Sequence, residues 1–149
     1  MSTTDQNLTA QHAEVKAEIA RTDAKTALLL AFIGAVMAGA WTVARDLPMN
    51  ALAYAAGGSG LVLLVAAAGL VLRSVRPNLN GGKGFVLWAT LTPQQIAATA
   101  EDRDLAADIA GLSRLAIAKF TCLRRAVDLT CAGGALLVLS ALIALGGTA

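Results

Sequence analysis

The chain has 149 residues, of which 56% are hydrophobic and only 15% are charged. Soluble domains are about 45–50% apolar and about 25% charged, so this composition argues against an ordinary water-soluble domain. The net charge of +2 is too small to indicate binding to a nucleic-acid polymer.

The first 25 residues are largely polar and have the pattern of an amphipathic helix. Leu8, Val15 and Ile19 form a narrow apolar stripe, and charged residues lie away from it. Such a stripe is typical of a helix–helix contact, either within the chain or between subunits. No Gly or Pro separates it from the uncharged run 26–44, so one continuous helix is predicted. His12 is expected to be solvated on this helix.

Three runs without charge have the length of a membrane helix, which needs about 20 residues. They cover residues 26–44, 51–72 and 129–147. Arg45 closes the first run, and Pro48 is expected to stop its helix in a short hairpin before the second. The sequence therefore predicts three transmembrane helices.

The distribution of Lys and Arg predicts the orientation. The N-terminal side holds three of these residues, the segment between the second and third runs holds eight, and the opposite side holds only Arg45. Cytoplasmic segments carry such an excess. We therefore expect a multi-pass protein of the inner (plasma) membrane, with a cytoplasmic N-terminus and a cytoplasmic insert at about 73–128. The whole chain, 1–149, is expected to form a single membrane domain.

The insert begins with a loop and continues as helix. NGGKG lacks the spacing of a nucleotide-binding phosphate loop, so a plain flexible loop is expected. Trp88 lies in a short apolar segment, a strand or an interfacial segment, and is expected at the headgroup boundary. Thr92 and Gln95 form a capping box that begins a short helix.

A second long helix is predicted from Leu105 onward, and it enters the third run without a break. Its apolar residues recur at three- and four-residue steps, which indicates another helix contact. These residues are Leu105, Ile109, Leu112, Ala116 and Leu123. The predicted fold is therefore all-α, with three transmembrane helices and a cytoplasmic helical stalk.

Ionisable residues lie at the ends of the predicted spans. Arg124 and Arg125 are expected at the cytoplasmic headgroups. Asp128 follows Arg124 by four residues, so the two are expected to pair, with the lining of a pore mouth as the alternative. Asp23 and Lys25 raise the same choice between helix pairing and a pore.

Small residues favour close helix contacts. The patterns Ala35–Gly39, Ala53–Gly57 and Ala56–Gly60 place two small residues four apart, which lets helices approach. Cys122 and Cys131 lie nine apart on one predicted helix, roughly 13 Å along its axis, which is too far for a disulfide. Both are expected to fill small gaps between helices.

No arrangement of residues suggests catalysis. No Ser or Cys lies beside a usable His, and no metal-ligand spacing is present. The protein is therefore expected not to be an enzyme and to use no metal or cofactor.

Three stretches support a resemblance to a known family. RTDAKTALLL enters the first span with Asp23 and Lys25, and LVLRSVRPNL leaves the second with Arg76. LSRLAIAKFTCLRRAV, with Lys119 and Arg124, leads into the third. In order and spacing, these stretches resemble the transmembrane effectors of the Pycsar anti-phage system.

The resemblance implies a function in antiviral defence. A partner nucleotide cyclase that senses phage makes cyclic CMP or cyclic UMP, and the effector responds by impairing the inner membrane, which causes abortive infection. Some members carry a recognisable cyclic-nucleotide-binding domain, but the insert here is too short for one. We expect the signal to change the packing of a homo-oligomer.

A cyclic mononucleotide presents one phosphate and one planar base, which need a cation and an aromatic or apolar slot. The preferred cations are Arg76 and Lys119, and Arg124 and Trp88 are further candidates. Two other functions stay open. One is that of a structural or scaffold membrane protein, and the other is that of a holin-like pore that needs no ligand.

Overall fold

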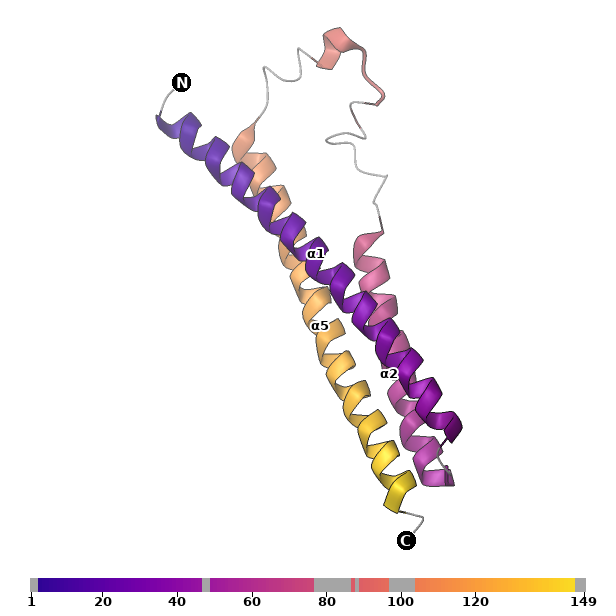
Figure 1. Cartoon of the computed structure of the whole chain (residues 1–149). Coiled ribbons are helices and arrows are strands. Elements are labelled where there is room, and N and C mark those ends of the chain that lie inside the picture. Colours follow the sequence, from indigo (N-terminus) through magenta and orange to yellow (C-terminus); the bar gives the residue numbers. More distant parts are fainter. Residues whose placement is uncertain (1–2, 47–48, 77–86, 88, 97–103, 147–149) are drawn as a thin grey trace. The chain divides into compact units, whose positions relative to one another are not determined.

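The structure is a computed structural model that describes residues 3–46, 49–76, 87, 89–96 and 104–146 (Figure 1). It contains three long α-helices, which are α1 (Thr3–Asp46), α2 (Ala51–Val75) and α5 (Leu105–Gly146). No strand occurs within these ranges. The prediction of an all-α protein is therefore confirmed.

All three helices are long and apolar enough to cross a membrane. Each contains an 18-residue window with a mean hydropathy of 2.1. α1 has 44 residues and α5 has 42, about twice what one crossing requires. Both continue from a polar stretch into an uncharged run without a break, as predicted. α1 ends at Asp46, and Pro48 lies outside the described residues.

Side-chain caps define where several helices begin. Asn50 Oδ1 accepts a hydrogen bond from the backbone N–H three residues later, at 2.8 Å, and Asp104 Oδ1 does the same at 3.1 Å. The predicted capping box is also present. The Thr92 backbone N–H donates to Gln95 Oε1 at 2.9 Å, and the Gln95 N–H donates to Thr92 Oγ1 at 3.4 Å. Each cap satisfies a backbone donor that the first turn leaves unpaired.

The chain divides into two compact units. Unit 1 comprises Met1–Ile19 and Arg76–Ala116, and unit 2 comprises Ala20–Val75 and Ile117–Ala149. In unit 1 the predicted apolar residues of both long helices are half-buried, which agrees with the predicted helix contacts. They are Leu8, Val15, Ile19, Leu105, Ile109, Leu112 and Ala116. The position of this unit in the cytoplasm stays a prediction.

His12 corrects the sequence analysis. It is half-buried rather than solvated, and its Nε2 is buried with no hydrogen-bond partner in the described part of the chain. The apolar stripe of α1 therefore includes the position of this histidine, which lies between Leu8 and Val15 at helical spacing.

Unit 2 is a three-helix assembly with a small core. Ile33 of α1 packs with Leu64 and Ala67 of α2, and all three are fully buried. Half-buried residues of all three helices surround them, namely Leu29, Val36, Met37, Ala68, Leu129 and Leu137. The uncharged runs therefore pack on one another.

α2 and α5 cross closely at two glycines. A Cβ added to Gly60 would lie 2.8 Å from the Gly133 carbonyl oxygen, and a Cβ added to Gly133 would lie 2.8 Å from the Gly60 carbonyl oxygen. Nearby, Ser140 Oγ donates a hydrogen bond to the Ala53 carbonyl at 2.7 Å. Ala53, Gly57 and Gly60 are buried, so two of the predicted small-residue patterns do mediate contact.

Other small residues face outward. Ala35 and Gly39 are exposed in the single chain, so the first small-residue pattern forms no such close contact. Both cysteines are free, but only Cys122 fills a gap, where its Sγ donates to the Leu70 carbonyl at 3.3 Å. Cys131 is exposed, so the same expectation is wrong for it within one chain.

The outer surface of unit 2 is strongly apolar. Large hydrophobic side chains that lie in the predicted spans are more than half exposed, including Leu28, Phe32, Val62, Val138 and Leu142. Monomeric soluble proteins rarely expose a contiguous patch of this kind. The surface suits contact with lipid tails or with further helices.

Candidate functional site

An ion pair joins the first and last helices of unit 2. Lys119 Nζ, on α5, donates to Asp23 Oδ1, on α1, at 2.7 Å. Asp23 lies just before the first uncharged run, and Lys119 lies on the polar stretch that leads into the third. The pair therefore links α1 and α5 where charged sequence gives way to the spans.

The pair is partly open to solvent. The Lys119 side chain is 20% exposed and the Asp23 side chain is 46% exposed. Water and salt screen a pair of this kind, so it contributes about 0.2–1 kcal/mol to stability. That is too little to lock the two helices together.

Buried threonines mark the same level of α1. Thr22 and Thr26 are almost fully buried, and Thr26 Oγ1 donates to the Thr22 carbonyl at 2.7 Å. On α5, Cys122 lies one turn after Lys119, and its bond to Leu70 brings α5 against α2. All three helices are thus in contact close to the ion pair.

From the sequence alone, Asp23 is a helix-pairing or pore candidate and Lys119 is a nucleotide-binding candidate, and no pattern predicts that the two contact each other. The signal available was opposite charge at the entry to two spans that run in the same direction. Helical periodicity does not determine how one helix is rotated about its axis against its neighbour. It therefore does not identify Lys119, among the nearby charged residues, as the partner of Asp23.

The structure does not contain the expected pair on α5. Arg124 and Asp128 are both exposed, and within the described residues no salt bridge joins them. Arg124 follows Lys119 by five residues, which places it about 140° around the helix, on another face. Lys25 is also exposed without an ionic partner among the described residues.

The remaining candidates for nucleotide binding are Arg76, Arg124 and Trp88. Arg76 is exposed at the bend that follows α2 and belongs to unit 1, whereas Lys119 belongs to unit 2. Trp88 lies outside the described residues. The set of Arg76, Lys119, Arg124 and Trp88 therefore stays a prediction.

Comparison with protein families gives one match. The model of the Pycsar effector protein domain matches residues 7–146, which covers nearly all of α1, all of α2 and all of α5. Neither the curated proteins nor the solved structures include a significant match. The matched region contains the Asp23–Lys119 pair and all three candidate spans. The chain therefore belongs to the Pycsar effector family, as its sequence motifs predicted.

Proposed function

We propose that this member of an anti-phage defence family responds to cyclic UMP or cyclic CMP by impairing the inner membrane. The observation that carries the proposal is the Asp23–Lys119 ion pair, which places an exchangeable cation between α1 and α5 beside the spans. A partner nucleotide cyclase supplies the signal. The resulting loss of membrane integrity stops the infected cell.

The nucleotide phosphate competes with Asp23 for Lys119. In the resting state the Asp23 carboxylate is paired with the Lys119 ammonium. A phosphate that approached Lys119 while this pair is closed would be repelled by Asp23. Binding is therefore stronger when the pair is open. This difference in affinity is what allows a ligand to shift the population toward the open state.

Arg124 is a further candidate cation for an anionic ligand, because it is exposed and makes no ion pair among the described residues. Arg76 is also exposed, and Trp88 lies outside the described residues. Both stay candidates from the sequence, Arg76 for the phosphate and Trp88 for the base. The protein binds the nucleotide without converting it, so the ligand is recovered chemically unchanged after incubation, as chromatography of the incubated sample tests.

The active form is a homo-oligomer. Asp128 is exposed on α5 next to the third uncharged run, and an unpaired carboxylate costs about 2.5–3.5 kcal/mol at the centre of a membrane helix. A second copy offers partners for it, because Arg73 and Arg124 are exposed at the same ends of the spans. With a cytoplasmic N-terminus and insert, the Asp23–Lys119 pair lies at the cytoplasmic ends of the spans, on the side where the cyclase works.

Cell measurements separate this function from its two alternatives. The chain is expressed with or without an active pyrimidine cyclase, and a potential-sensitive dye reports the inner membrane. Depolarisation only with the cyclase supports the proposed effector. Depolarisation under both conditions indicates a holin-like pore, and no depolarisation under either indicates a scaffold protein.

A further inference from the structure

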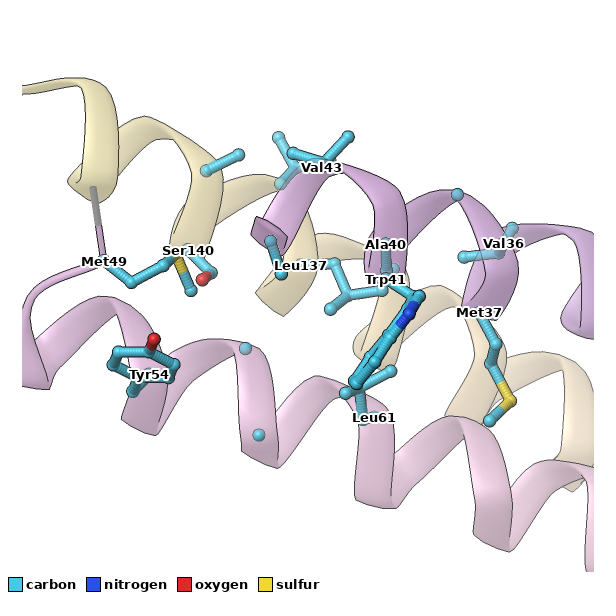
Figure 2. Close-up of a pocket in the computed structure, with 17 residues that line it drawn as sticks. Val36, Met37, Ala40, Trp41, Val43, Met49, Tyr54, Leu61, Leu137 and Ser140 are labelled. Atoms are coloured by element: carbon cyan, nitrogen blue, oxygen red, sulfur yellow. The ribbon is translucent and has the colours of Figure 1, made fainter. Parts of the chain in front are cut away.

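Unit 2 contains a cavity of about 710 Å³ at the end away from the Asp23–Lys119 pair. Side chains of all three helices and the α1–α2 connection line it, and Figure 2 shows Trp41 reaching from α1 toward Leu61 of α2. Met49 and Tyr54 lie toward the other end of the hollow (Figure 2). The volume is within the 300–1,000 Å³ of typical small-molecule sites.

The interior of the cavity is apolar. Met37, Leu61 and Leu137 contribute hydrocarbon and thioether groups. Ser140 also lines it, but its hydroxyl is already bound to the Ala53 carbonyl. An apolar cavity of this kind does not hold water well. Its occupant in a membrane is therefore a hydrocarbon group.

The edge of the cavity is polar and cationic. The Arg45 guanidinium carbon lies 5.1 Å from the centre of the Trp41 ring, which itself lines the cavity. Arg45 is exposed and makes no salt bridge among the described residues. Trp41 and Tyr54 are the side-chain types that favour the headgroup level of a bilayer. An anionic group at this edge would meet a cation held in place by an aromatic ring.

We propose that the cavity is a phospholipid site, in which one acyl chain fills the apolar interior and the lipid phosphate binds Arg45. The amphipathic lining favours a lipid over a transmembrane helix of a second copy, which is apolar along its length. This site does not depend on the proposed response to nucleotides.

Glycines allow a specific test. Gly58 and Gly39 line the cavity, and a Cβ added at either meets nothing within 4 Å. Gly58→Leu and Gly39→Leu therefore place a side chain at the cavity without a backbone clash. Gly69 and Gly34 are equally open but do not line it, so Gly69→Leu and Gly34→Leu are matched controls on the same two helices.

The probe is phosphatidylglycerol with brominated acyl chains, which quenches tryptophan fluorescence. It is titrated into the purified full chain in mild detergent, with Trp88→Phe leaving Trp41 as the only tryptophan, excited at a wavelength that Tyr54 does not absorb. We expect saturable quenching, weakened at least tenfold by Gly58→Leu or Gly39→Leu and by less than twofold in the controls. Arg45→Gln is expected to lower the affinity for the brominated phosphatidylglycerol about fivefold. Brominated diacylglycerol, which lacks the phosphate, is expected to bind the unchanged protein about fivefold more weakly than phosphatidylglycerol does.

Three results overturn the proposal. They are quenching that never saturates, quenching that neither cavity variant alters, and quenching that depends equally on control and cavity positions. Circular dichroism identifies any variant that does not fold. If one of the two cavity variants does not fold, the test is made with the other. Oligomer mass is measured in parallel. A loss of mass in both folded cavity variants assigns the cavity to a second copy instead.

Discussion

Lys119 of α5 donates a hydrogen bond from Nζ to Asp23 Oδ1 of α1, across a distance of 2.7 Å. The two residues are 96 positions apart in the chain, so only the packing of the first helix on the last brings them together. Neither charge is fully buried. The contact is therefore partly screened by solvent, and it lies where the charged stretches of α1 and α5 give way to the uncharged runs.

Asp23→Asn tests whether this ion pair holds the resting state. Loss of a contact worth up to about 1 kcal/mol raises the open population by up to about fivefold. We expect a higher basal leak, measured as dye depolarisation in cells without a cyclase. The double variant Asp23→Lys with Lys119→Asp restores the pair and the low leak. Asp46→Asn, at the far end of α1, is the control and leaves the leak unchanged.

An unchanged leak in Asp23→Asn, or an equal increase in Asp46→Asn, contradicts the role of the ion pair.

Lys119→Gln tests the proposed phosphate contact. A hydrogen bond to a charged group contributes about 1.5–3 kcal/mol, so we expect the affinity for cyclic UMP or cyclic CMP to fall at least tenfold. Isothermal titration calorimetry on the detergent-solubilised chain measures it. Arg125→Gln removes an exposed cation from the same helix and serves as the control. Equal affinities for the unchanged chain and Lys119→Gln remove this residue from the site.

Gly60→Ala tests the close crossing of α2 and α5. The new Cβ would lie 2.8 Å from the Gly133 oxygen and 3.2 Å from Leu136 and Leu137 atoms, so the helices must separate. Overpacking of this kind costs about 1–3 kcal/mol. Unfolding by sodium dodecyl sulfate in mixed micelles reports the loss. Gly69→Ala, whose Cβ meets nothing within 4 Å, is the control, and similar stability of the two variants contradicts the observed packing.

Asp128→Leu tests the proposed oligomer. The exposed carboxylate is expected to pair with an arginine of a neighbouring copy, so its loss removes a polar contact worth about 0.6 kcal/mol on average in membrane proteins. Light scattering in detergent should show a shift to smaller species at low protein concentration. The comparison is Val138→Leu, an apolar change at an exposed position. A mass unaffected by Asp128→Leu places the oligomer contact elsewhere.

Local features of the fold were predictable because they depend on neighbouring residues. The spans follow from runs without charge, and the continuity of α1 and α5 follows from the absence of Pro between their polar and apolar parts. The Thr92–Gln95 capping box is likewise local, because its two residues are only three positions apart. The half-buried stripes in unit 1 follow from helical spacing.

Features that depend on the rotation of one helix about another were not predictable. Several Lys and Arg residues lie near the ends of the predicted spans, and only the packing of α1 on α5 shows that Lys119 is the one that pairs with Asp23. Gly133 lies in no pattern that the sequence analysis singled out, yet it forms the closest approach to Gly60. The i, i+4 spacing of Arg124 and Asp128 permits a pair, but both are exposed, where solvation of each charge competes with pairing.

Ion flux across defined liposomes tests the central claim most directly, because only the chain, the lipid and the nucleotide are present. Purified protein is reconstituted, a potential is set, and cyclic UMP, cyclic CMP or cyclic AMP is added on the side that holds the N-terminus. The account predicts rapid flux with a cyclic pyrimidine nucleotide, little flux with cyclic AMP, and none of the added flux in Lys119→Gln. Flux that is the same with and without every nucleotide, or absent throughout, contradicts it.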